Sequence, residues 1–213
     1  MNDEIRDWES AYRQLPYQEI HPHPLVLQLA ERVDPTRHLH WLDLGCGDGR
    51  HLVYLAQRGW QMYGLDLAMW GLIRTGERLE MDDLPAMLTY GNMQKLPLAQ
   101  GSLDGVISIK VIHHQVYRDI RKTFSEIKRV LRPGGLLLAS LPQAPVENWK
   151  QGRYREVEAG TYIPLEGFEQ GIPHHFFEQT EISECLTGFE VLNQEIDEWG
   201  YVCILAQNIQ DAQ

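Results

Sequence analysis

The sequence predicts an α/β protein with a doubly wound, mostly parallel β-sheet, and three features support this fold class. Apolar stretches of strand length alternate with segments of helical periodicity between about residues 39 and 141. A glycine-rich loop joins the first of these strands to the helix that follows it. Two further strand-like stretches near the C-terminus predict an antiparallel hairpin. Repeated alternation of strands and helices is typical of parallel sheets with right-handed crossover connections.

Two candidate helices precede the first strand. Residues 3–15 carry apolar side chains at helical spacing, which predicts an amphipathic helix; these side chains are Trp8, Ala11, Tyr12 and Leu15. A proline-rich stretch then interrupts the pattern. Pro24 suits the first position of a second helix, and Asp34-Pro35 ends it.

The central part of the chain alternates strands with helices. Strands are expected at residues 39–44, 60–66, 87–90, 103–109 and 136–141. Helices are expected after the first, second and fourth strands, and the last of these helices covers residues 117–131. Gly59 and the run Arg132-Pro133-Gly134-Gly135 are typical helix-ending signals. The unbroken apolar run at residues 136–141 suits a strand buried on both faces.

The pattern changes after residue 142. Residues 143–175 are rich in proline, glycine, glutamate and aromatic residues and show no clear period. A short helix is expected at residues 179–187, followed by strands at 189–196 and 201–205. The two strands meet at Trp199-Gly200, which favours a hairpin.

Composition narrows the classes of protein. A chain of 213 residues with 43% hydrophobic and 23% charged residues fits one soluble globular domain. No apolar run approaches ~18 residues, so no membrane span is expected. The polar N-terminus argues against a secretory signal and favours the cytoplasm. Cys46, Cys185 and Cys203 form no C-x-x-C pair, which predicts reduced thiols.

The charge balance disfavours nucleic acid as a partner without excluding it. The net charge is −11, from 30 acidic and 19 basic residues, and a phosphate backbone repels such a surface. The densest basic segment, Arg118 to Arg132, has helical spacing. We interpret it as the solvated outer face of a helix rather than a binding patch.

The most informative motif follows the first strand. The run Asp43-Leu44-Gly45-Cys46-Gly47-Asp48-Gly49 reads D-x-G-x-G-x-G. Alternating glycines bring bare backbone N–H groups and a helix N-terminus close to a ligand. Dinucleotide dehydrogenases typically carry G-x-G-x-x-G, so this spacing disfavours a nicotinamide-dependent oxidoreductase. The plain alternative is a tight turn without a ligand.

This run resembles motif I of the class I S-adenosylmethionine-dependent methyltransferases, of the methyltransferase type 11/12-like group. The resemblance implies a seven-stranded Rossmann-like sheet and S-adenosyl-L-methionine as the cofactor. It implies that Asp43 helps to bind the amino group of the cofactor. It also implies that the chain passes beneath the methionine part of the cofactor, at Gly45, Cys46, Gly47 and Gly49.

The same resemblance implies roles at the ends of the next strands. Asp66 closes the second strand and falls on the ribose-binding position, where a carboxylate accepts two hydroxyl hydrogen bonds. Leu67 would flank the adenosine. Asn92 stands where many relatives have an acid that binds the adenine amine, and Met93 offers an apolar wall. The alternatives to these binding roles are that Asp66 is a surface acid at the start of a helix and that Asn92 is a turn residue.

Residues near the fourth strand should also touch the cofactor, in particular Ser108 and Ile109. Methyl transfer is an in-line attack that needs alignment, and it needs a general base only for a protonated nucleophile. The catalytic residue is therefore left unknown, and the candidates are His113, His174 and Tyr12. Adjacent histidines are expected to project in different directions, so no metal site is predicted at His113-His114.

We divide the chain into four parts. Residues 1–37 form N-terminal helices that cap the site, and residues 38–142 form the cofactor-binding core. Residues 143–177 form an insertion that covers the substrate, and residues 178–213 complete the same domain with a helix and a hairpin. The insertion includes the aromatic residues Trp149, Tyr154 and Tyr162, which could wall an aromatic pocket or hold the segment down as a hydrophobic cluster.

The predicted function is a methyltransferase that acts on a small molecule. Gly171 to Phe177 loosely resembles small-molecule methyltransferases related to the tellurite-resistance enzymes. Val106 to His114 resembles enzymes that methylate wobble-uridine side chains of tRNA, which is the first alternative. A non-catalytic S-adenosylmethionine-binding protein is the second, and its sign would be a damaged glycine loop or a missing ribose acid. The sequence specifies neither the acceptor atom nor the oligomeric state.

Overall fold

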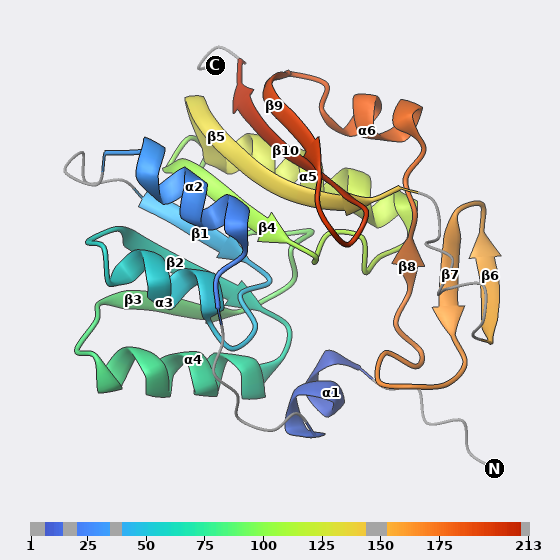
Figure 1. Ribbon diagram of the computed structural model, residues 1–213, viewed down its shortest axis with the longest axis horizontal. Coiled ribbons are helices and arrows are strands. Elements are labelled where there is room, and N and C mark those ends of the chain that lie inside the picture. The colour runs from blue at the N-terminus through green and yellow to red at the C-terminus, as the bar shows by residue number, and fades with distance from the viewer. Residues whose placement is uncertain (1–6, 15–20, 35–39, 144–152, 210–213) are drawn as a thin grey trace.

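The computed structural model describes residues 7–14, 21–34, 40–143 and 153–209, and it confirms the predicted fold class (Figure 1). Its main sheet has seven strands in the order β3-β2-β1-β4-β5-β10-β9. Their bounds are β1 His40–Leu44, β2 Gln61–Asp66, β3 Ala86–Tyr90, β4 Leu103–Ile109, β5 Leu131–Pro142, β9 Phe189–Ile196 and β10 Tyr201–Asn208. Parts of the expected first helix and Trp149 lie outside the described residues.

The strand order places a reversal at the centre of the sheet. β1 pairs in parallel with β2 on one side and with β4 on the other, so Asp43 lies opposite both Gly64 and Ile107. The chain runs outward from β1 through β2 to β3 and then returns to β4. The connections that leave β1 and β4 therefore diverge, and a crevice opens at the carboxyl ends of these two strands. β10 pairs antiparallel with β5 and with β9, which confirms the expected hairpin.

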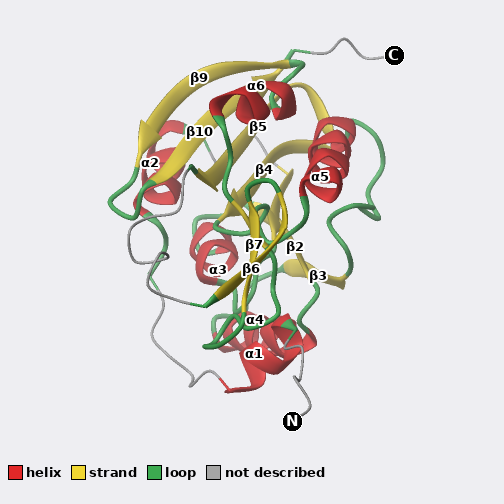
Figure 2. Cartoon of the chain, turned by 90° about the vertical axis from the view of Figure 1, so that its right-hand side faces the viewer, coloured by secondary structure: helices red, strands yellow, loops and turns green. Residues whose placement is uncertain are grey.

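Helices cover both faces of the main sheet. One face packs against α2 (Pro24–Arg32), α3 (Arg50–Ala56) and α4 (Met69–Met81). The other face packs against α5 (Tyr117–Val130) and α6 (Gln179–Cys185). Figure 2 shows α2 and α3 on the opposite side of the sheet from α5. Among the described residues, no helix is long and apolar enough to cross a bilayer.

The segment between β5 and α6 contains a second, smaller sheet that the sequence did not predict. Its strands are β6 (Tyr154–Glu158), β7 (Thr161–Pro164) and β8 (His174–His175). Two backbone hydrogen bonds fasten it to the core, from the His175 N–H to the His113 carbonyl and from the Phe177 N–H to the Pro142 carbonyl, both 2.8 Å. These strands span two to five residues, too few to show an alternating pattern.

Most expected elements agree with the structure to within one or two residues, and β5 is the main difference. β5 begins at Leu131 rather than Leu136, so the run Arg132-Pro133-Gly134-Gly135 belongs to the strand. The pairing with β4 shifts register between Leu103 and Gly105, which accommodates these residues as a distorted strand start. The three cysteines are buried and form no disulfide in the described chain.

Two glycine substitutions test how tightly the core is packed. Gly105 lies in β4 under the ring of Trp41, and an added Cβ would overlap that fully buried ring. Gly105→Ala is therefore expected to lower the free energy of unfolding by about 1–3 kcal/mol.

Gly76 lies within α4, where a Cβ added to it would lie 3.8 Å from the nearest atom, which belongs to the Leu88 side chain. Gly76→Ala is expected to raise that free energy by about 0.5–1 kcal/mol. Urea denaturation measures both, and effects of equal sign would contradict this packing.

Candidate functional site

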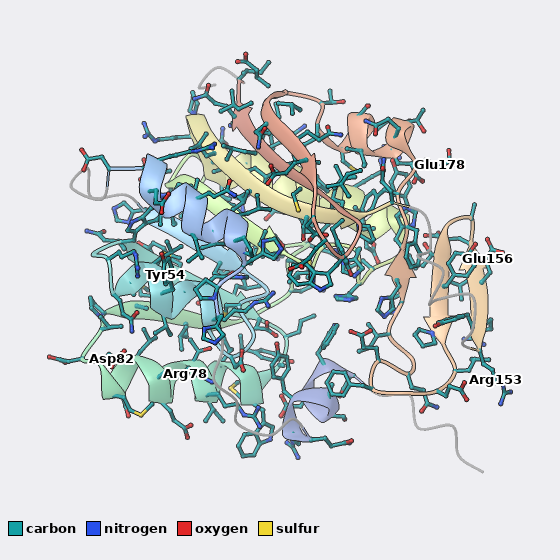
Figure 3. All side chains as sticks on the ribbon, in the orientation of Figure 1. Tyr54, Arg78, Asp82, Arg153, Glu156 and Glu178 are labelled. Carbon is teal, nitrogen blue, oxygen red and sulfur yellow. The ribbon has the colours of Figure 1, made fainter. Side chains whose placement is uncertain are left out.

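The main cavity of the described chain lies at the carboxyl ends of β1 to β4, where the strand order reverses. It is lined by Trp8, Tyr12, Gly45, Leu65, Asp66, Leu67, Gly91, Met93, Lys110, Val111 and His114. A wider recess adjoins it, bounded by Trp8, Leu67, His114 and the segment Gly171 to Pro173. Figure 3 shows Arg153 and Glu156 at the outer side of the small sheet, away from the main sheet.

The glycine loop after β1 forms one wall of this cavity. Gly45, Gly47 and Gly49 have φ values of 75°, 53° and 85°, a region that side-chain-bearing residues rarely adopt. A Cβ on Gly45 would overlap Val111, a Cβ on Gly47 would overlap the Tyr12 hydroxyl, and a Cβ on Gly49 would overlap the Thr75 side chain. These glycines are therefore required both by the backbone conformation and by close packing.

Asp66 joins the loop to the end of β2. Its Oδ2 accepts a hydrogen bond from the Gly47 N–H at 2.7 Å, and its Oδ1 accepts one from the Ala68 N–H at 2.7 Å. Burial raises the pKa of this carboxyl, although the two N–H donors oppose that shift. Each carboxylate oxygen can accept a further hydrogen bond. Asp66 therefore holds the loop and still presents acceptor sites to the cavity that it lines.

Asp43 lies behind the loop and is not among the residues that line the cavity. Its side chain is 1% exposed, and its Oδ2 accepts a hydrogen bond from the Leu52 N–H at 3.2 Å. The other oxygen lies 3.9 Å from His51 Nδ1. Burial raises the pKa of Asp43 to about 7. This carboxyl therefore ties the end of β1 to the first turn of α3.

Helix α1 (Trp8–Gln14) covers the loop from outside. The Tyr12 hydroxyl packs against Gly47, and burial together with the nearby charge of Asp66 raises the pKa of the phenol. Tyr12 is thus a neutral hydrogen-bond donor at this position. The Trp8 ring packs edge-on against His114, with centroids 4.7 Å apart. Glu9 accepts a hydrogen bond from the Trp70 N–H at 3.1 Å, which fastens α1 to the start of α4.

The residues after β3 divide between the cavity and its mouth. Met93 lines the main cavity. Asn92 is exposed and borders only an outer recess. Its Oδ1 accepts a hydrogen bond from the Gln94 N–H at 2.8 Å, which is the geometry of a turn asparagine.

The end of β4 contributes differently from the expectation. Ser108 and Ile109 are buried and are not among the cavity-lining residues, and the Ser108 hydroxyl donates to the Leu44 carbonyl at 3.1 Å. Lys110, at φ 61°, does line the cavity. Its ammonium lies 3.6 Å from the centroid of the Trp199 ring at the β9–β10 turn, and burial lowers its pKa.

Three histidines gather beside the cavity. The ring centroids of His113 and His114 are 3.8 Å apart, and the ring of His174 lies 5.7 Å and 4.7 Å from them. The expectation that adjacent histidines point apart is wrong here, because alternation belongs to extended strands. His113 and His114 instead lie in a turn, closed by a 3.0 Å hydrogen bond from the His114 N–H to the Val111 carbonyl.

The environment keeps these three imidazoles neutral. His113 and His174 are 1% and 2% exposed, and His114 is partly exposed and lines the cavity. Burial lowers the pKa of all three rings, to about 4 for His174. The Glu169 carboxylate lies 3.5 Å from His174 Nε2.

The structure therefore gathers only part of the predicted site around the cavity. Tyr12, Gly45, Asp66, Leu67 and Met93 line it. The remaining predicted residues lie behind this wall or at the mouth: Asp43, Cys46, Gly47, Gly49, Asn92, Ser108, Ile109, His113 and His174. Lys110 and His114 also line the cavity, and both follow the fourth strand at the point where the order reverses.

Comparison with known proteins supports one family. Residues 42–139 match the family model described as "Methyltransferase domain". A ribosomal RNA small subunit methyltransferase C from Alcanivorax borkumensis is 30% identical over 141 residues, which cover 64% of this chain and 43% of the relative. A mouse tRNA (carboxymethyluridine(34)-5-O)-methyltransferase is 25% identical over 84% of this chain and 27% of the relative. The chain thus spans less than half the length of either curated relative.

Solved structures share the fold. A SAM-dependent methyltransferase from Methanosarcina mazei superposes with a TM-score of 0.76 at 19% identity, covering 90% of this chain and all of that one. A 1,6-didemethyltoxoflavin-N1-methyltransferase from Burkholderia thailandensis, with bound S-adenosylhomocysteine, gives 0.66 at 18% identity. That match covers 95% of this chain and 80% of the other.

The buried carboxyl of Asp43 predicts a specific pH dependence of stability. Its pKa is about 7 in the folded state and about 3.9 in the unfolded state, so its proton stabilises the fold at low pH. That stability is lost as the pH rises through 7, by about 2–3 kcal/mol between pH 5 and pH 8.

The Asp43→Asn variant has no carboxyl at this position to lose a proton. Between pH 5 and pH 8 its free energy of unfolding should therefore fall less than that of the wild type. Urea denaturation at both pH values measures the difference, with the exposed Asp82→Asn as control. An identical pH dependence in the wild type and Asp43→Asn would contradict the assignment.

Proposed function

This chain belongs to the class I S-adenosylmethionine-dependent methyltransferases, and from that premise we propose that it transfers a methyl group from S-adenosylmethionine to a small-molecule acceptor. One observation carries the proposal. The glycine loop and the Asp66 carboxylate form adjoining walls of a single cavity at the carboxyl ends of the central strands. Ligands of open α/β sheets bind at such a reversal of strand order.

The residues present fit this cofactor. The left-handed glycines shape the loop so that Gly45 lines the cavity, and Asp66 keeps acceptor capacity toward the same cavity. We assign Gly45, Gly47 and Gly49 to the methionine part and Asp66 to the ribose hydroxyls. Met93 and Leu67 would contact the adenine, with Asn92 at the outer edge. When bound, S-adenosylmethionine supplies an activated methyl group on a sulfonium.

The positions of the other assigned residues favour supporting roles. Asp43 fixes the start of α3 and so positions the loop from behind, although it does not reach the cavity wall. Ser108 and Ile109 are buried, and the Ser108 hydroxyl ties β4 to the end of β1 by donating to the Leu44 carbonyl. Cys46 is buried beneath the loop, and burial raises the pKa of its thiol, which disfavours a thiolate nucleophile.

The chain's own residues supply alignment and exclusion of water. α1 places Tyr12 over the glycine loop, where its neutral hydroxyl can donate a hydrogen bond to an acidic group of the cofactor. Its raised pKa favours that role over the role of a general base. Trp8 and His114 pack together at the junction of the cavity and the outer recess. Closing this junction around an acceptor would remove water and hold the reacting atoms in line.

The outer recess supports a small acceptor. It is bounded mostly by apolar and aromatic side chains, including Trp8, Leu67, Met69 and Tyr90, and by Ile172 and Pro173 from the segment before β8. Its polar lining residues are Asp7, Glu9 and His114. A mostly apolar lining with a small number of polar groups is typical of small-molecule pockets. We therefore keep residues 143–177 as the segment that covers the acceptor.

A tRNA acceptor is the second candidate, and the match to the mouse tRNA methyltransferase over 84% of this chain favours it. The electrostatics oppose it. The basic residues of α5 lie beside acids: Lys122 pairs with Asp119 at 2.9 Å and Arg129 pairs with Glu126 at 2.7 Å. The chain also carries a net charge of −11. Neither feature suits a phosphate backbone.

Cofactor binding tests the first half of the proposal. Calorimetric titration should show binding of S-adenosylmethionine and none of NADH. Asp66→Ala should weaken binding by about 1.5–3 kcal/mol, because it removes charged hydrogen bonds to the ribose. Glu77→Ala, an exposed acid on α4, serves as the control and should bind like the wild type. Unchanged affinity in Asp66→Ala would contradict the ribose assignment.

A labelled-methyl screen tests the acceptor class. The protein is incubated with S-adenosylmethionine carrying a radioactive methyl group and with separate pools of metabolites and of tRNA. The lining of the recess predicts incorporation in the metabolite pool. Incorporation in tRNA alone would replace the first candidate with the second. Cofactor binding without transfer to either pool would favour a non-catalytic binding protein.

A further inference from the structure

We propose that His113, His114 and His174 bind one divalent transition-metal ion, of the class that includes Zn²⁺, at the edge of the cavity. One potential ligand nitrogen from each residue lies within 4.8 Å of those of the other two. The three residues come from two segments far apart in the sequence, the turn after β4 and strand β8. This proposal does not depend on methyl transfer.

The distances suit a metal after a small adjustment. In a tetrahedral zinc site with Zn–N bonds of about 2.0–2.1 Å, the ligand nitrogens are about 3.3 Å apart. The present spacing of up to 4.8 Å requires each ring to move inward by about 1 Å, within the range of side-chain rotation. Imidazole nitrogens suit zinc, copper, nickel and iron rather than magnesium or calcium, which prefer oxygen ligands.

Burial and hydrogen bonding separate this set from ordinary core histidines. His113 is 1% exposed, and its Nδ1 has no hydrogen-bond partner in the described part of the chain. A buried polar atom without a partner costs free energy, and a bound cation would remove that cost where it meets this nitrogen. His175, next along the chain from His174, differs in this respect. One of its ring nitrogens lies 2.7 Å from Thr161 Oγ1 and the other 3.1 Å from Glu181 Oε2.

The surroundings supply a feature common to zinc sites. The Glu169 carboxylate lies 3.5 Å from His174 Nε2, and a carboxylate beside a ligand imidazole orients the ring and increases its basicity.

The arrangement leaves a coordination position toward the cavity. His113 and His174 are buried, whereas His114 lines both the main cavity and the outer recess. Three protein ligands with a fourth position open to a cavity are typical of zinc sites that exchange a bound water for another ligand. A metal held here would face the compartment assigned to the acceptor.

Metal titration of the full chain, prepared metal-free and without an affinity tag, tests the site. Calorimetry with Zn²⁺ should show one equivalent bound, and Mg²⁺ should not compete. His114→Ala and His174→Ala should each weaken Zn²⁺ binding by at least about tenfold. His21→Ala removes an exposed histidine and should leave it unchanged. Thermal unfolding followed by circular dichroism serves as the check on the fold of each variant.

X-ray absorption of the zinc-loaded wild type provides a test that needs no variant. The expected first shell contains three imidazole nitrogens and one further light ligand. The proposal is overturned by a folded wild type that binds no Zn²⁺, by a first shell with fewer than three imidazoles, or by equal affinity in folded histidine variants. Zn²⁺ binding without cofactor binding would instead contradict the proposed function and leave this site in place.

Discussion

The Asp66 carboxylate is the interaction on which the rest of the site depends. It accepts N–H hydrogen bonds from Gly47 on one side and Ala68 on the other, so one side chain joins the loop after β1 to the start of α4. The β2 backbone reinforces this connection, because the Leu65 carbonyl accepts from the Gly45 and Cys46 N–H groups. Thr75 completes it by donating to the Gly47 carbonyl at 2.9 Å. The loop is thus fixed before any ligand arrives, which lowers the entropy cost of binding at its surface.

The features that depend on local residue patterns could be predicted from the sequence. The glycine spacing, the acid at the end of β2 and the strand boundaries of the core depend on residues close together in the chain, and the structure confirms the fold that they predict. Asp43 is a residue whose position, but not the direction of its side chain, could be predicted from the sequence. Its place at the end of a strand is readable from the sequence, but the direction of its carboxyl depends on the packing of α3 against the sheet.

The remaining features depend on contacts between distant segments. Tyr12 reaches Gly47 from α1, which Glu9 fastens to α4 and Trp8 packs against His114. Lys110 lines the cavity because its left-handed backbone and the Trp199 ring direct it there. The small sheet has strands too short for a periodic pattern, yet it brings His174 to His113 and His114. No spacing rule in the sequence connects residues 60 positions apart.

The difference between features set by local sequence and features set by distant contacts also separates the two halves of the cavity. The half of the cavity assigned to the cofactor is built by the loop after β1 and the ends of β2 and β3, which are consecutive in the chain and recognisable from their motifs. The half assigned to the acceptor is built by α1, the turn after β4 and the segment that leads to β8. Trp8, His114 and Ile172 line the recess, and neither Asp66 nor a glycine of the loop has to be replaced to change that lining. On the proposed function, acceptor specificity can therefore vary while the methyl donor stays the same, and the histidine cluster lies where two of these segments meet.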